Sequence, residues 1–133
     1  MPEIKPIDAR ALMAAAELAF RSRDVETIIE LFDEDVEVCF ADFEPMSGKA
    51  NYRAFLEARF RRQLNYHPTT TIEFVGEDVI GASWEATWTD AVSGQAMAGR
   101  GCEFVRLRGR KIVKYTVAFN AWPQGAGSLT PII

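Results

Sequence analysis

The sequence is poor in the side chains that bind metal ions. Among 133 residues it has one histidine, His67, and two cysteines, Cys39 and Cys102. A metal centre of the zinc type needs several nitrogen or sulfur ligands at close spacing, and no such cluster is present. We therefore predict no metal site. Both cysteines stand in apolar runs, which favours free, buried thiols in a reducing compartment over the alternative of a disulfide.

A long apolar segment is also missing. No uninterrupted apolar stretch approaches the roughly 18 residues of a membrane-spanning helix. The first residues, Met1 to Lys5, contain no apolar signal-peptide core. We therefore expect a cytoplasmic protein that does not bind membranes.

Positive charge is not in surplus. Lysine and arginine number 15 against 19 aspartates and glutamates, a net charge of −4 at pH 7. A nucleic-acid-binding protein needs a basic face to neutralise phosphates, so we expect no nucleic-acid partner. One basic concentration lies on a predicted helix that also carries Glu57, and we interpret it as a solvated helix face; it comprises Lys49, Arg53, Arg59, Arg61 and Arg62.

Three motifs of common enzyme classes do not occur. The chain has no glycine-rich phosphate loop, no nucleophile elbow and no cysteine–histidine pair. Nucleotide hydrolysis and acyl-enzyme chemistry are therefore not expected. The chemistry that remains is acid/base catalysis by side chains, without a cofactor.

The composition is that of a folded domain. Hydrophobic residues make up 48% of the chain and charged residues 26%, which is ordinary for a globular protein with a real core. The length suits one domain. We predict a single domain over residues 1–133, with a core at about 8–122 and a tail at 123–133.

Two amphipathic helices are predicted first. Apolar residues recur at i, i+3, i+4 and i+7 from Asp8 to about Ser22, and again after Asp24, which is suited to cap the second helix. The acidic run at 33–35 is expected to end this helix as a solvated turn.

A third helix is predicted after a short strand at 36–40. Ser47 is expected to cap it, and it should end near Gln63. Its apolar stripe consists of Tyr52, Phe55, Leu56 and Phe60.

The remainder alternates with the period of strands. After His67-Pro68, strands are predicted at 69–75, 79–90, 95–108 and 111–122, separated by breaks that contain glycine and suit hairpins. Helices followed by a meander are typical of the α+β class. Because strands of a dozen residues must coil, we expect the N-terminal helices to pack in the concave face of a curved antiparallel sheet.

Three segments carry a resemblance to a known family: Arg23-Asp24-Val25 through Leu31-Phe32, Glu44-Pro45-Met46-Ser47-Gly48, and Glu103-Phe104-Val105-Arg106-Leu107 leading through Gly109 into Lys111-Ile112-Val113. From the first helix to Trp122 the chain resembles the nuclear transport factor 2-like superfamily, in its polyketide-cyclase and ketosteroid-isomerase-like (SnoaL-like) branch. The resemblance implies a cone-shaped fold, a deep pocket between sheet and helices, and homodimers that pair outer sheet faces. Its members include isomerases, cyclases, dehydratases, epoxide hydrolases and proteins without known chemistry, so the fold does not name an activity.

The polar residues of the steroid isomerases transfer only in part. Their carboxylate base falls on Phe40 and their oxyanion-hole tyrosine near Ala16, neither of which can do that work. Their third polar residue, an acid, matches Glu103. The epoxide-hydrolase pattern of an arginine flanked by two aspartates is absent, because Arg100 is followed two residues later by Cys102.

Three residues are candidates for catalysis. Glu103 shares a strand face with Val105 and Leu107, where burial would raise the pKa of its carboxyl and suit it to acid/base work. The alternatives are a carboxylate satisfied in a structural network, or the opposite strand face. Tyr115 could place its hydroxyl beside Glu103 across the hairpin, or be a core residue with a wet tip. Asp42 could supply a carboxylate near the pocket mouth, or form a turn.

Other residues are candidates for contacting a ligand. Trp84 and Trp88 share one strand face with small alanines between them, so they are flat pocket walls or plain core. His67 is a pocket-rim residue or an exposed loop histidine. The full predicted ligand-binding set is Phe40, Phe55, His67, Trp84, Trp88 and Val117.

Two functions follow from these features. The first is cofactor-free isomerisation, cyclisation or dehydration of an apolar carbonyl compound, with Glu103 as acid/base and Tyr115 as donor. The second is a non-catalytic ligand-binding or dimerisation module, which the apolar residues Phe40 and Ala16 favour. The expected partners are a small apolar or aromatic ligand and a second copy of the chain.

Overall fold

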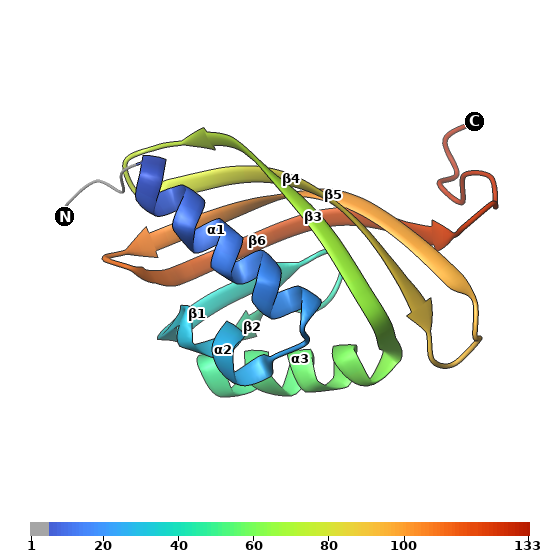
Figure 1. The fold of residues 1–133 in the computed structure, drawn as a ribbon, viewed down its shortest axis with the longest axis horizontal. Coiled ribbons are helices and arrows are strands. Elements are labelled where there is room, and N and C mark those ends of the chain that lie inside the picture. The colour runs from blue at the N-terminus through green and yellow to red at the C-terminus, as the bar shows by residue number, and fades with distance from the viewer. Residues whose placement is uncertain (1–5) are drawn as a thin grey trace.

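The architecture is three helices against one side of a six-stranded sheet, in a computed structural model that describes residues 6–133 (Figure 1). The helices are α1 (Pro6–Arg21), α2 (Val25–Glu30) and α3 (Lys49–Arg62). The strands are β1 (Phe32–Phe40), β2 (Met46–Ser47), β3 (Gln63–Val75), β4 (Val79–Asp90), β5 (Ala96–Arg108) and β6 (Lys111–Pro123). The predicted α+β class is confirmed.

The sheet has the strand order β2-β1-β6-β5-β4-β3. Strands β3 to β6 form the predicted antiparallel meander. Strand β1, however, pairs with β6 in parallel, for example Phe40 with Val117, so the sheet is not wholly antiparallel as expected. A parallel pair requires a long crossover connection, and here α3 and the first three strands of the meander supply it.

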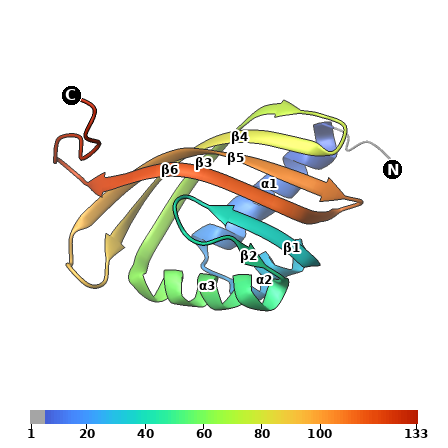
Figure 2. The ribbon, with the colours of Figure 1, turned by 180° about the vertical axis from the view of Figure 1, so that it is seen from behind.

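The sheet is curved, and the helices lie in its concave side as predicted. Figure 1 shows β3 rising from the end of α3 past α1. The view from behind shows β6 across the outer face, with α1 on the far side of the sheet (Figure 2). Register shifts between Leu64 and His67 and between Ile72 and Phe74 bend β3, because bulges increase local twist. The interior between helices and sheet is the core, whose largest fully buried side chains are Ile28, Phe32, Val36, Val38, Tyr52, Leu56, Ile80 and Val105.

The cap of α2 is the one expected. The Asp24 carboxylate accepts a hydrogen bond from the Thr27 backbone N–H at 3.2 Å and another from the Thr27 hydroxyl at 2.6 Å. The acidic run 33–35 is not a turn that ends this helix, since it lies within β1. The register of β1 against β6 shifts between Phe32 and Glu37, so the three acidic residues lie in an irregular part of the strand. Glu34 and Asp35 are exposed, and the half-buried Asp33 pairs with Arg108 at 3.3 Å.

The start of α3 differs from the prediction. Its N-cap is Gly48, at a φ of 87°, with no side-chain cap. This backbone conformation favours glycine. Ser47 belongs to β2, and its hydroxyl donates to the Glu37 carboxylate at 2.9 Å. The predicted serine cap was therefore wrong, because a neighbouring strand binds that hydroxyl.

Two further expectations about exposure are corrected. Cys39 is half-buried and Cys102 is exposed on β5, and both are free thiols. Cys102 was expected to be buried, but strand alternation turns it to the outer face while Glu103 turns inward.

Within residues 6–133, no helix is long and apolar enough to cross a membrane.

Candidate functional site

A partly open cavity lies between α1 and the concave face of the sheet. Its volume is about 50 Å³, enough for a few water molecules, since one water needs roughly 10–15 Å³ of such space. Apolar side chains form most of the wall, and the polar exceptions are Glu17, Arg59, Tyr66, Thr70, Glu103 and Tyr115. The cavity is therefore an apolar chamber that holds a few ionisable groups largely out of water.

Glu103 and Tyr115 form a hydrogen-bonded pair on this wall. Alternation along β5 turns Glu103 to the inner face together with Val105. On β6 the hydroxyl of Tyr115 donates to Glu103 Oε2 at 2.5 Å. The two side chains are only 6% and 8% exposed. Oε1 of Glu103 forms no hydrogen bond within the described part of the chain, so it is available to a ligand.

A bulge in β6 positions Tyr115. Simple alternation would place Val113 on the same face as Tyr115, but the register between β5 and β6 shifts at Arg106–Leu107. As a result Ile112 and Tyr115, three residues apart, both line the cavity, and Val113 does not. The extra residue in the bulge accounts for the change of face.

Burial controls the protonation of the pair. It raises the pKa of Glu103 from its ordinary value of 4.5, against the opposing effects of the Tyr115 hydrogen bond and the Arg59 charge. Burial also raises the pKa of Tyr115 well above 10.0, so this phenol stays protonated. A carboxyl with a raised pKa can both donate and accept a proton near neutral pH.

The raised pKa of Glu103 predicts a pH-dependent stability. The folded state retains a proton that the unfolded state releases near pH 4.5. Relative to Glu103→Gln, the wild-type protein should therefore lose free energy of unfolding as the pH rises from 4.5 through the folded-state pKa. Urea unfolding of both proteins over this range measures the loss, with Glu57→Gln, an exposed α3 carboxylate, as control. A difference that is constant with pH would contradict this account.

Two further tyrosines lie near Glu103 and Tyr115: Tyr52 on α3, whose ring centroid is 6.4 Å from that of Tyr115, and Tyr66 on β3, which lines the same cavity. Tyr52 is fully buried, and burial raises its pKa strongly. Its hydroxyl has no hydrogen-bond partner in residues 6–133, although buried hydroxyls are usually paired. Tyr66 is 5% exposed, and burial raises its pKa as well. Both phenols are thus neutral hydrogen-bond donors near the cavity.

Within residues 6–133, Arg59 is the one cation on the cavity wall. Its guanidinium carbon lies 4.9 Å from the ring centroid of Tyr66 and 5.2 Å from that of Phe40. It is also 5.4 Å from both Phe20 and Phe60. These distances permit cation–π attraction. The helix face of Arg59 is therefore not the solvated one that the basic cluster suggested.

An aromatic groove continues from the cavity past Arg59. Its volume is about 440 Å³, within the range of small-molecule sites. Phe40, Arg59, Tyr66 and Trp84 line both the cavity and the groove. At its far wall the Trp88 ring packs on β5 at Gly99, where a Cβ atom would lie 3.0 Å from Trp88 Cη2. The absence of a side chain at Gly99 leaves space for this flat wall.

Most of the predicted site residues meet in these two spaces. Phe40, Trp84, Glu103, Tyr115 and Val117 line the cavity, and Phe55 and Trp88 line the groove with Phe40 and Trp84. The roles assigned to them stay predictions.

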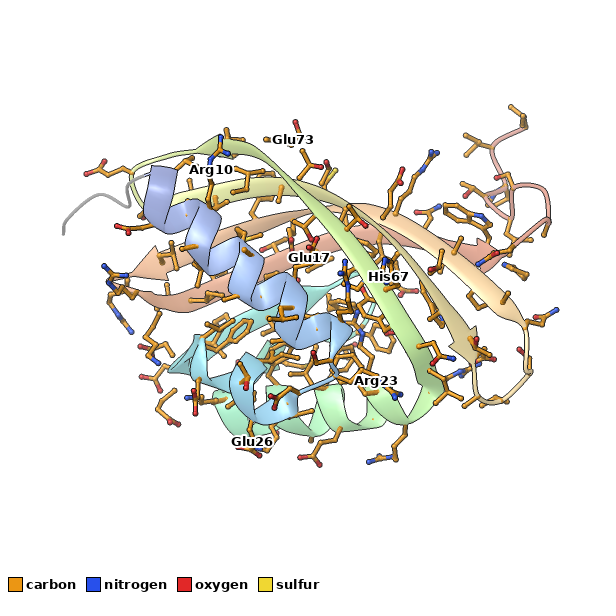
Figure 3. The ribbon with its side chains drawn as sticks, viewed as in Figure 1. Arg10, Glu17, Arg23, Glu26, His67 and Glu73 are labelled. Carbon is orange, nitrogen blue, oxygen red and sulfur yellow. The ribbon has the colours of Figure 1, made fainter. Side chains whose placement is uncertain are left out.

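Asp42 and His67 lie elsewhere. Asp42 is exposed in the turn after β1, beyond Ala41 at a φ of 50°. His67 is within β3, not before it, and is exposed beside Thr69 and Trp122 on the outer face. Figure 3 labels His67 on this strand. Because β3 begins at Gln63, alternation turns Tyr66 inward and His67 outward.

Sequence reasoning missed Arg59, Tyr66 and Glu17. A signal for Arg59 exists, because it follows Phe55 by four residues and Leu56 by three, which places it beside the apolar stripe of α3. Glu17 projects from α1 toward β3 (Figure 3), where it accepts a hydrogen bond from the Thr70 N–H at 2.5 Å. That contact has no local sequence signal.

Comparison with known proteins identifies a family for this chain. Residues 10–115 match the SnoaL-like domain family. No match is found among curated proteins.

Solved structures share the fold at low sequence identity. A candidate polyketide cyclase from Xanthomonas campestris pv. campestris is 20% identical, with a TM-score of 0.75, covering 85% of this chain and 90% of that one. A hypothetical protein with a ketosteroid isomerase-like fold from Catenulispora acidiphila, in complex with trimethylamine, is 17% identical, with a TM-score of 0.73 and coverages of 80% and 82%. TerC, co-crystallised with polyporic acid, is 16% identical, with a TM-score of 0.74 and coverages of 85% and 92%.

The family match spans most of the chain and includes the elements that build the cavity, from α1 to Tyr115 on β6. The structural neighbours independently place the fold among nuclear transport factor 2-like proteins. The chain belongs to the SnoaL-like domain family.

Proposed function

We propose that the chain binds a small carbonyl compound and that Glu103 moves a proton on it without a cofactor. The observation that carries the proposal is the buried Glu103–Tyr115 pair on the wall of an otherwise mainly apolar cavity. Structural neighbours named as a polyketide cyclase candidate and an isomerase candidate are consistent with such chemistry. Isomerisation, cyclisation and dehydration all need such a proton transfer.

The proposed step uses only groups of the chain. The Glu103 carboxylate takes a proton from the carbon next to the ligand carbonyl. The electrons of that C–H bond then form the enolate, and the proton rests on Glu103. Return of the proton to another carbon gives an isomer. In dehydration the enolate electrons form a C=C bond, the C–O bond of a β-hydroxyl group breaks, and the hydroxide takes the proton from Glu103 and leaves as water. Tyr115 is the positioning residue, because its hydrogen bond to Oε2 orients the carboxyl group.

A second function is favoured by a specific observation. The positions corresponding to the isomerase base and tyrosine, Phe40 and Ala16, are both apolar and both line the cavity. The chain would then bind a ligand without converting it. The structural neighbour TerC was co-crystallised with a small molecule, polyporic acid.

A thermal-shift screen tests for the ligand site that both functions require. We expect β-tetralone or a similar flat ketone at about 100 times its dissociation constant to add roughly 2.7 kcal/mol of stability, which raises the melting temperature by several degrees. Val117 lines the cavity, so the larger side chain in Val117→Trp should occupy the cavity space and abolish the shift in melting temperature. Ala118→Ser, on the exposed outer face of the same strand, is the control. If no flat ketone shifts the wild-type protein, the proposal is wrong.

A further inference from the structure

We propose that the ligand is an anion with a flat aromatic body, and that Arg59 selects it by pairing with its negative charge. This inference rests on the proposed function, because it takes the cavity and groove as a ligand site. It adds the charge of the ligand and the residue that recognises it.

Arg59 lacks the carboxylate partner that Arg53 and Arg62 have on the same helix. Arg53 pairs with Glu26, its Nη2 lying 3.1 Å from Oε2, and Arg62 pairs with Asp90 at 2.7 Å. No carboxylate within residues 6–133 forms an ion pair with Arg59. Its hydrogen-bond partners are neutral: Nε donates to Gln63 Oε1 at 2.6 Å, and the side chain also interacts with the Tyr66 hydroxyl. A guanidinium has five N–H donors, so those that Gln63 and Tyr66 do not use can bind an incoming group.

The surroundings make this unpaired charge costly. Four aromatic rings enclose the guanidinium at 4.9 to 5.4 Å, on α1, β1, α3 and β3. The rings attract the cation, but of these four side chains only Tyr66 has a hydroxyl that can accept a hydrogen bond, and that hydroxyl carries no charge. A partly desolvated cation of this kind gains most from an anion that enters the same apolar space.

The acidic groups that line the two spaces are already engaged. Glu17 accepts from the Thr70 N–H and lies 3.8 Å from Arg21. Asp90 is bound by Arg62 and by Ser93, whose hydroxyl is at 2.8 Å.

Glu103 accepts from Tyr115, and burial raises its pKa. In a protein of net charge −4, the cavity mouth at Arg59 is thus a local positive site.

The size and lining of the groove indicate the shape and chemistry of the ligand body that accompanies the negative charge. The cavity beside Glu103 holds about 50 Å³, too little for an aromatic molecule, whereas the groove holds about 440 Å³. Aromatic rings form its bed: Phe40, Phe43, Phe55, Trp84, Trp88 and Phe119. Flat aromatic bodies stack on such surfaces. The ligand body therefore lies in the groove with its acidic oxygen at Arg59, and only its reacting end reaches Glu103.

Calorimetric titration with a matched pair of probes tests the inference. The probes are naphthalene carboxylate and naphthalene carboxamide, which share size and shape and differ in charge. We expect the wild-type protein to bind the acid about tenfold more tightly than the amide, the effect of one charge-assisted hydrogen bond. Arg59→Met should remove this preference. Arg61→Met, an exposed arginine on the same helix, should keep it.

The melting temperature separates this role from a structural one. Because Arg59→Met replaces an unpaired, half-buried cation with an apolar chain of similar length, the ligand-free variant should melt at or above the wild-type temperature. A fall of several degrees would show that Arg59 is a structural residue and overturn the inference. So would a preference for the acid that survives Arg59→Met.

The outcomes distinguish the inference from the function on which it rests. If acid and amide bind the wild-type protein equally while a flat ketone still exchanges protons through Glu103, the charge inference fails and the proposed function stands. If neither probe binds at millimolar concentration and no flat ketone shifts the melting temperature, both fail.

Discussion

Replacing Glu103 with glutamine is expected to slow proton exchange on a bound ketone by about 10²- to 10⁴-fold, the usual contribution of one acid/base group. The amide keeps the shape of the side chain and can still accept the Tyr115 hydrogen bond, but it cannot take a proton. Incubation of β-tetralone in deuterated water, followed by proton NMR, measures loss of the signals next to the carbonyl. The ligand-induced thermal shift should persist, because binding does not require the transfer.

Matched variants make this result specific. Glu85→Gln changes an exposed carboxylate on neighbouring β4 and should exchange at the wild-type rate. Tyr115→Phe removes the hydrogen bond that lowers the pKa of Glu103, so the midpoint of the pH–rate profile should move to higher pH. Equal exchange by the wild-type protein and Glu103→Gln would reject the catalytic role. Binding without exchange by either protein would support the non-catalytic module.

Replacing Phe32 with alanine is expected to give the largest loss of stability, about 3 to 5 kcal/mol. Phe32 is 2% exposed, and its ring centroid lies 4.8 Å from that of Tyr52 and 5.7 Å from that of Tyr115. Truncation removes these contacts and leaves a void at the cavity wall. Domains of this kind are stable by only about 5 to 15 kcal/mol in total. Equilibrium unfolding in urea measures the change.

The same experiment needs an aromatic control outside the core. Phe43→Ala removes a ring that is 55% exposed and should cost about 1 kcal/mol or less, because surface substitutions rarely cost more. Similar losses for the two variants would contradict the packing described for Phe32. A changed denaturant slope in Phe32→Ala would indicate an altered denatured or native state instead of a simple loss of contacts.

Local patterns predicted the elements well where one face of an element is apolar. The bounds of β4 and the end of β5 agree with the predicted strands at 79–90 and 95–108. The same alternation places Glu103 inward and explains why the neighbouring thiol of Cys102 is outward. The two-residue period of side chains predicted a strand only from residue 69, whereas β3 begins at Gln63. Gln63 and Leu64 pair with β4 before an irregularity at Asn65, whose φ of 54° interrupts the alternation.

Arg59 shows why the site was harder to predict than the fold. A charged residue beside an apolar stripe is assigned to water by its type, although its spacing from Phe55 and Leu56 places it near the core. The rings of Phe20, Phe40 and Tyr66, from three other elements, give it an apolar environment. For Asp42 and His67 the alternatives to a pocket role hold: Asp42 is an exposed turn residue and His67 is exposed, and neither lines the cavity or the groove.

By itself, the sequence determined the three helices and the central parts of the four meander strands, and it placed Glu103 on a strand face shared with apolar residues. It could do so because the helix period of 3.6 and the strand period of two can be read from neighbouring residues. The tertiary structure alone decided that β1 pairs with β6, that rings from four elements enclose Arg59, and that a small cavity opens past Arg59 into an aromatic groove. These features depend on contacts between residues far apart in the chain. Local spacing carries no information about such contacts, so they emerge only when the sheet curves around the helices.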